Sequence, residues 1–297
     1  NFHLMNIPFT SSLFLIALTG MIFPVVHSFS TTKHYQGRIR SIRALTKLYA
    51  VADLPTMEEV ESADFMVAID LADAVCVQLV GDTDGVAGAE AAAQLLPSFF
   101  KSSDQARGWF VTSLTGPSFR DAALDPAVVK AILHATNPLS SSSSSSASFL
   151  TRLILMNVIM PLATAMQHEA MGNAEQASLS IETFQRASDL VKAVVALDLQ
   201  QQLQRVQKGD GAAEEGPAVT RLRSDLRAIA AAATIAEAGW NDKDEESEEG
   251  SGVSVNDDKG SDVDRLKFWL KFMAKWKYQP PQKQAIYAVT DDLLKSF

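Results

Sequence analysis

His168 and Glu169 have the residue types of a catalytic zinc site. They match the first two letters of the H-E-x-x-H motif, in which a second histidine four residues later lies on the same helix face and completes the pair of ligands. Position 172 is Gly172, so the second ligand is missing and the sequence predicts no zinc site here. We interpret His168 as a histidine near the end of a helix.

Residues 80–85 contain two aspartates in the arrangement of a calcium-binding loop. When this segment is aligned on its last glycine, Asp82 and Asp84 occupy ligand positions of an EF-hand. Val80 then stands at the first ligand position and Ala91 at the bidentate position, where oxygen ligands are required. The segment is therefore predicted to be a polar loop between two helices.

Histidine is too scarce for a di-iron site of the kind that helical bundles carry. Such a site uses two Glu-x-x-His pairs and further glutamates. After residue 50 the chain has two histidines, His134 and His168, and Ala131 and Ala165 precede them by three residues. The chain also lacks G-x-G-x-x-G, a Walker lysine and G-x-S-x-G. We predict no catalytic residue, no cofactor and no metal, and the sequence favours a non-enzymatic protein.

Asp70 and Asp73 lie one turn apart on a predicted helix, on a face with Met66 and Val77. A carboxylate pair could perform acid–base chemistry or bind a cation, whereas the usual interpretation is a boundary between core and solvent. Cys76 falls among apolar positions of the same helix, which predicts a small core residue. Because it is the only cysteine, an internal disulfide and a Cys-rich metal site are excluded.

The strongest indication of an interaction surface lies in a predicted helix over Val263–Tyr278. Its apolar residues share one face, and its basic residues give the helix a net charge of +4. A basic, aromatic amphipathic helix is typical of contact with an anionic membrane surface or with a groove on a partner protein. Alternatively, the aromatic side chains dock on the rest of the protein and the lysines are solvated. The interaction residues that we select are Trp269, Phe272, Trp276, Lys267, Lys271 and Lys275.

Helical periodicity runs through almost the whole chain after residue 50. Apolar residues recur every three or four positions, and no convincing strand is visible. We predict an all-α fold, an irregular antiparallel helical bundle with flexible linkers and a C-terminal amphipathic helix. Besides the helix over Val263–Tyr278, the expected helices are about Thr56–Val80, Ala89–Phe100, Ser103–Leu114, Pro126–Thr136, Phe149–Ala170, Asn173–Lys208 and Pro217–Gly239, with a short one after Pro281.

The expected helix Phe149–Ala170 is the most apolar element, and its residues 153–166 have no charge. A membrane span requires about 20 predominantly apolar residues, and Arg152, Asn157 and Pro161 interrupt this one. We therefore predict a buried central helix with a kink at Pro161. The short turn after it predicts an antiparallel hairpin with the long helix that follows.

Composition divides the chain into four parts. These are a predicted targeting presequence (residues 1–50), a helical domain (53–239), an acidic disordered linker (241–262) and a C-terminal helical segment (263–297). Within the helical domain, the serine run at 140–147 is predicted to be a flexible linker. The acidic linker is predicted to be solvated, because blocks of like charge rarely bury apolar surface.

The presequence has two successive parts. Residues 7–26 are uncharged and lead into Val26-His27-Ser28, which fits a signal-peptide cleavage site. Residues 29–50 have five basic residues, several hydroxyl residues and no acid, which is transit-peptide composition. This order, with an aromatic residue at the junction, resembles the bipartite plastid presequence of algae with complex plastids. The resemblance implies a plastid stromal protein; secretion, or retention of residues 7–26 as a membrane anchor, are the alternatives.

The net charge of the chain excludes one class of partner. The 297-residue chain has a net charge of −9, and without the five bases of residues 1–50 it has 21 bases against 35 acids, a net charge of −14. Electrostatic nucleic-acid binders are basic, so we expect no nucleic-acid partner. We predict a plastid scaffold, assembly or regulatory factor that contacts a protein or an anionic membrane surface. The alternative is a small-molecule binder or cofactor-free enzyme with a pocket around Asp70, Asp73 and His168.

Overall fold

The computed structural model describes residues 54–80, 86–119, 121–137, 144–209, 216–235 and 261–297. Within these residues every regular element is a helix, which confirms the predicted all-α fold. The predicted presequence, the acidic linker before Ser261 and the Asp82–Asp84 pair lie outside the described residues.

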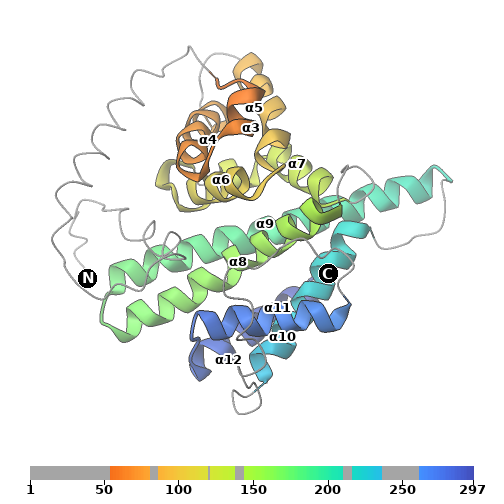
Figure 1. The fold of residues 1–297 in the computed structure, drawn as a ribbon. Coiled ribbons are helices and arrows are strands. Elements are labelled where there is room, and N and C mark those ends of the chain that lie inside the picture. The colour runs from red at the N-terminus through yellow and green to blue at the C-terminus, as the bar shows by residue number, and fades with distance from the viewer. Residues whose placement is uncertain (1–53, 81–85, 120, 138–143, 210–215, 236–260) are drawn as a thin grey trace, which may run out of the picture.

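A central hairpin organises the helices (Figure 1). It is formed by α8 (Ser144–Ala170) and α9 (Ala174–Gln207), which pack along each other as predicted. One group of helices covers one side of the hairpin, and a second group covers the other side. The first group is α3 (Met57–Ser62), α4 (Phe65–Val80), α5 (Val86–Phe99), α6 (Ser103–Thr115) and α7 (Pro126–Thr136); the second is α10 (Pro217–Thr234), α11 (Asp262–Lys275) and α12 (Pro280–Lys295).

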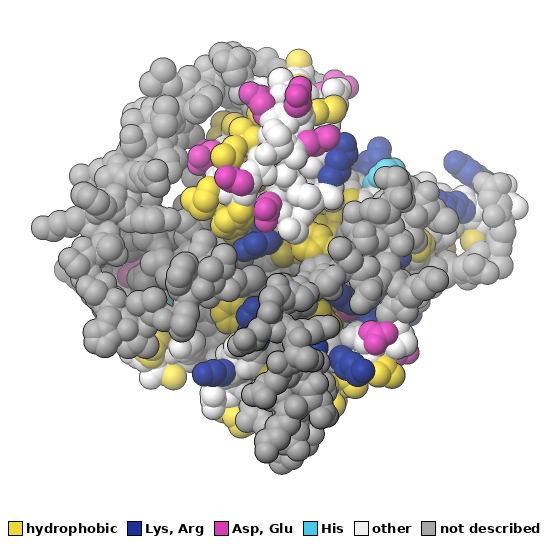
Figure 2. All heavy atoms as spheres, in the orientation of Figure 1, with side chains coloured by type: hydrophobic (Ala, Val, Ile, Leu, Met, Phe, Trp, Pro, Cys, Tyr) yellow, Lys and Arg dark blue, Asp and Glu magenta, His cyan; other side chains and the backbone are white. Residues whose placement is uncertain are grey.

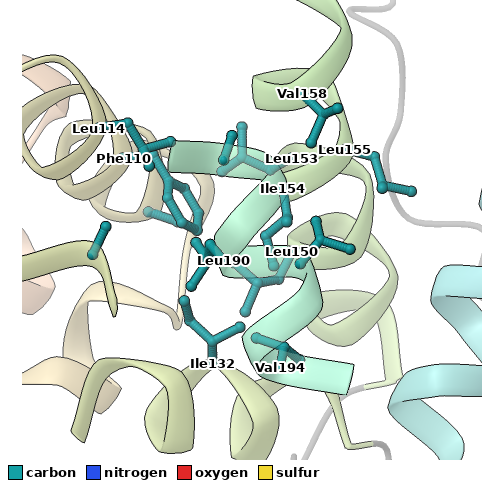
Figure 3. Close-up of a cluster of buried hydrophobic side chains, with 14 of the residues drawn as sticks. Phe110, Leu114, Ile132, Leu150, Leu153, Ile154, Leu155, Val158, Leu190 and Val194 are labelled. Atoms are coloured by element: carbon teal, nitrogen blue, oxygen red, sulfur yellow. The ribbon is translucent and has the colours of Figure 1, made fainter. Parts of the chain in front are cut away.

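Helix α8 supplies much of the core. It is long and apolar enough to cross a membrane, but 72% of its most apolar stretch is buried inside the protein. Leu150, Ile154 and Val158 of α8 meet aliphatic and aromatic side chains of α6, α7 and α9 in one cluster (Figure 3). Burying a large apolar side chain contributes about 1.5–3 kcal/mol, so the apolar composition of α8 stabilises the fold.

The first expected helix is divided in two. Thr56 and Glu59 form a reciprocal capping box at the start of α3, which ends at Ala63 in an extended conformation. The Asp64 carboxylate then accepts a hydrogen bond from the Val67 N–H at 2.9 Å. Such a bond satisfies a free N–H at a helix start, so α4 begins as a new helix and the predicted continuous helix over Thr56–Val80 is wrong.

Helix α8 begins inside the predicted serine linker. Helix α8 begins at Ser144, so the last four residues of the predicted linker at 140–147 are helical. Ala147 is fully buried, and its carbonyl accepts a hydrogen bond from the Thr151 hydroxyl at 2.9 Å. Burial of Ala147 and the Thr151 hydrogen bond to its carbonyl stabilise the start of α8, although the composition here is typical of a linker.

Candidate functional site

The six interaction residues predicted on α11 divide into docked aromatic side chains and exposed lysines. Trp269 is fully buried, Phe272 is 7% exposed and Trp276 is half-buried. The aromatic face of α11 therefore packs against the protein, which was the alternative to membrane or partner contact. The three lysines, Lys267, Lys271 and Lys275, are exposed.

A buried carboxylate on α10 holds α11 in this position. Asp225 is fully buried and accepts hydrogen bonds from Trp269 Nε1 at 3.0 Å and from Arg265 Nη1 at 3.0 Å. The buried Arg152 of α8 lies with its guanidinium carbon 4.3 Å from the centre of the Phe268 ring. Burial raises the pKa of the Asp225 carboxyl, while the Trp269 hydrogen bond and the two arginines oppose that shift. This cluster joins α8, α10 and α11.

A pocket of about 980 Å³ lies where the C-terminal end of α8 meets the turn between α11 and α12. Ligand pockets commonly enclose about 300–1,000 Å³, so this one has room for a small molecule. Three methionines give its walls apolar, adaptable side chains. The residues that line the pocket include Met160, Met166, Met171, His168, Trp276 and Tyr278.

The turn between α11 and α12 shapes one wall of the pocket. Lys277 has a left-handed φ of 52°, and the Tyr278 N–H donates to the Met273 carbonyl at 3.2 Å, as in a Schellman helix end. A left-handed backbone at a residue other than glycine costs about 1–2 kcal/mol. Gln282 Nε2 donates to the Ala163 carbonyl of α8 at 2.7 Å, so the start of α12 is tied directly to the opposite wall.

Three buried polar atoms on residues that line this pocket have no hydrogen-bond partner in the described part of the chain. They are His168 Nδ1, Trp276 Nε1 and the Tyr278 hydroxyl. Tyr278 is only 5% exposed, and burial raises the pKa of its phenol, so the hydroxyl is neutral and keeps its proton. A buried polar group without a partner costs about 1–3 kcal/mol. A bound molecule with suitable polar atoms would remove that cost.

The pocket contains some of the residues that the sequence analysis selected and lacks others. His168 lines it, but Asp70 and Asp73 lie on α4 and do not. The predicted grouping of the two aspartates with His168 is therefore wrong, because α4 belongs to the group of helices on the other side of the central hairpin. For Trp276 the sequence predicts membrane or partner contact, and no sequence pattern indicates a functional role for Tyr278.

Asp73 and Cys76 have environments that fit the core boundary. Burial raises the pKa of the Asp73 carboxyl, and the neighbouring negative charge of Asp70 raises it further. Cys76 is fully buried, and burial followed by the charge of Asp73 raises the pKa of its thiol. A thiol that stays protonated is a poor nucleophile, so the structure confirms the prediction of a small core residue.

Replacing Asp73 with asparagine should stabilise the protein at neutral pH. The folded-state pKa of Asp73 lies above its unfolded value, so stability is lost as the pH rises from about 4 through that raised pKa. Asparagine has no charge, so it removes this pH-dependent loss of stability and also the repulsion between Asp70 and Asp73. Repulsion between like charges one helical turn apart costs about 0.2–0.5 kcal/mol. Urea unfolding at pH 7 and pH 3 should show a gain at pH 7 that disappears at pH 3. An equal gain at both pH values would contradict the electrostatic cause.

Among the residues that the structure describes, no three His, Cys, Asp or Glu side chains converge to hold a metal ion.

Charged residues are distributed unevenly over the protein. Residues 51–100 contain ten acids and no Lys or Arg, and Figure 2 shows acidic side chains over α3–α5 on the face that it displays. The exposed lysines of α11 belong to the opposite group of helices.

Comparison with known proteins identifies a family. The family model described as "Uncharacterised conserved protein UCP020893" matches residues 64–220, which is more than half of the chain. No curated protein and no solved structure matches the chain. The matched residues extend from α4 to the first turn of α10, so they include the α8 wall of the pocket but not its α11–α12 wall.

Proposed function

The chain belongs to the family described as uncharacterised conserved protein UCP020893, and for this member we propose a non-enzymatic function: binding of a small, largely apolar molecule between α8 and the α11–α12 turn. One observation carries the proposal, which is that three residues with an unpartnered buried polar atom line one pocket together with three methionines. Small-molecule sites typically combine apolar walls with a few polar groups that orient the ligand. This function was the alternative prediction from the sequence, now without the two aspartates.

A neutral fluorescent dye tests the proposal without assuming the ligand's charge. We expect Nile red to bind the full chain saturably and to brighten, because the pocket walls are apolar. Met166 is half-buried and lines the pocket on its α8 wall. Met166→Trp should therefore fill the pocket and abolish this binding. Leu203→Trp on the exposed end of α9 is the matched control and should bind the dye normally. Equal dye binding by both variants, or none by the parent protein, would contradict the proposal.

Contact through α11 is the second candidate function, and the exposure of Lys267, Lys271 and Lys275 supports it. Each lysine near an anionic membrane contributes about 1 kcal/mol. Three lysines therefore give an affinity weaker than millimolar, and the docked aromatic side chains add no insertion energy. We therefore rank this function below ligand binding. Vesicles of anionic lipid that retain the protein at 150 mM salt would reverse that ranking.

We also propose that the protein acts in the plastid stroma after removal of the presequence. The support is the order of an uncharged segment, an aromatic junction and a basic, acid-free segment in residues 1–50. N-terminal sequencing of the protein isolated from its own cells tests this. A mature start close to residue 50 fits import, whereas an intact segment 7–26 in membranes would show a retained anchor.

A further inference from the structure

We propose that the ligand is an amphiphile with a carboxylate head group, and that the Trp276 indole and the Tyr278 hydroxyl donate hydrogen bonds to this head. The apolar chain of the ligand would lie along the methionines of α8. This inference rests on the proposed ligand-binding function and deepens it by naming the chemical class.

The chemistry of the unpartnered atoms defines the head group. An indole N–H can only donate a hydrogen bond, so Trp276 requires an acceptor. The Tyr278 hydroxyl is neutral at physiological pH and can also donate. His168 Nδ1 adds a third unpartnered atom, on a residue of the opposite, α8 wall. A carboxylate offers two oxygens with about four lone-pair sites, whereas an ammonium group offers no acceptor.

The charges beside the pocket favour an anion over a neutral acceptor. Lys277 lines the pocket and is exposed. The first turn of α12, with Pro281 and Gln282, also lines it, and the N-terminus of a helix carries partial positive charge. Glu169 lines the pocket as well and opposes an anion, but it is exposed to solvent, where its charge is screened.

The α8 wall suits an apolar chain. Met160, Ala163, Gln167 and Ala170 line the pocket at the three- and four-residue spacing of one helix face. Three of these four side chains are apolar, and Met166 and Met171 extend the surface on either side. Each CH₂ group that moves from water onto such a surface strengthens binding about fourfold. Affinity should therefore rise with chain length while the head group remains the same.

Indole N–H resonances of the full chain give a readout at the proposed contact atom. With ¹⁵N-labelled tryptophan, we expect sodium decanoate below its micelle concentration to shift the Trp276 resonance saturably, and Trp276→Phe identifies that resonance. Trp109 is the internal control, because its indole N–H is also buried and unpartnered but lies in the α6 core. A decanoate response of Trp109 with no response of Trp276 would overturn the inference.

The Tyr278→Phe variant separates the hydroxyl from the ring. Because the Tyr278 hydroxyl has no partner in the described protein, the unligated variant should unfold at the same temperature as the parent or higher. Its affinity for decanoate should fall at least about tenfold, since the lost hydrogen bond is to a charged group. Tyr287→Phe on α12, where the ring is 43% exposed and outside the pocket, should change neither property.

Comparing the affinities of neutral and cationic analogues with that of decanoate tests which head group the pocket prefers. We expect methyl decanoate and decylamine to bind at least about tenfold more weakly than decanoate. Equal binding of acid and ester would overturn the carboxylate inference and leave the proposed ligand-binding function standing. If neither the analogues nor Nile red bind, the three polar atoms are satisfied by ordered water only, and both proposals fail.

Discussion

Replacing Asp225 with alanine is expected to lower the free energy of unfolding by about 3–5 kcal/mol. The Asp225 carboxylate is fully buried and accepts hydrogen bonds from Arg265, whose side chain is 18% exposed, and from the buried Trp269. Its removal leaves a guanidinium and an indole N–H without that acceptor at the α10–α11 contact. Urea unfolding at pH 7, followed by tryptophan fluorescence, measures the loss.

Two further variants show whether charge or packing causes this loss. Asp225→Asn keeps the size of the side chain and an oxygen that can accept from Trp269, so it should lose less than the alanine variant. Asp291→Ala removes an acid that is 40% exposed and pairs with Lys295, and exposed pairs contribute only about 0–1 kcal/mol. If Asp225→Ala costs no more than Asp291→Ala, the buried cluster does not hold α11.

Loss of the Asp225 contacts should also affect the pocket. Trp276 and Tyr278 follow α11 directly, and their positions depend on how that helix sits on α10. In Asp225→Ala at a temperature where the protein is still folded, decanoate should bind more weakly than to the parent. Asp225 does not line the pocket. Weaker binding in this variant would therefore show that Asp225 acts on the pocket through the position of α11.

Local patterns in the sequence were sufficient to predict most of the helices and the central hairpin. Asp125 is an example, because its carboxylate accepts a hydrogen bond from the Ala127 N–H at 2.8 Å and Pro126 is the first residue of α7, as predicted. Caps of this kind act within three or four residues, so a single sequence displays them. The break at Ala63 uses the same kind of bond and was missed, because the apolar spacing continues across it.

The docking of α11 depends on residues that are far apart in the sequence. An amphipathic helix has the same pattern whether its apolar face meets a membrane or the protein core. In this protein the apolar face of α11 meets the core, where Asp225 accepts hydrogen bonds from Arg265 and Trp269. Asp225 lies 40 residues before Arg265 and 44 before Trp269. No local rule pairs these residues, so the sequence left both alternatives open.

The pocket could not be predicted from the sequence, because its walls also come from segments that are far apart in the chain. His168 stands on α8, whereas Trp276 and Tyr278 stand at the turn before α12, and these segments meet through packing. Pro280 and Pro281 do predict that a turn follows Tyr278. The chain, however, reverses direction after α11 through the left-handed backbone at Lys277, and hydrophobic periodicity contains no indication of that conformation.

The same substitution, glycine to alanine, is expected to have opposite effects at two helical positions. A Cβ atom at Gly108 of α6 would lie 2.6 Å from the Ala68 Cβ and 2.9 Å from the Ala68 carbonyl carbon of α4. These atoms are rigid, so α4 and α6 would have to separate. Overpacking costs about 1–3 kcal/mol or more, which outweighs the alanine helix preference of about 1 kcal/mol. Thermal unfolding of Gly108→Ala should show a clear decrease in Tm.

Gly88 in α5 provides the matched comparison. A Cβ atom there would approach only the end of the flexible Gln78 side chain, at 2.8 Å, and that side chain can move away. Gly88→Ala should therefore gain up to about 1 kcal/mol from helix preference and raise the Tm. If both variants raise the Tm, α4 and α6 do not approach as closely as the contact at Ala68 requires. Because Gly108 and Ala68 both lie within residues 64–220, opposite effects would establish a close α4–α6 crossing inside the family-matched part of the chain.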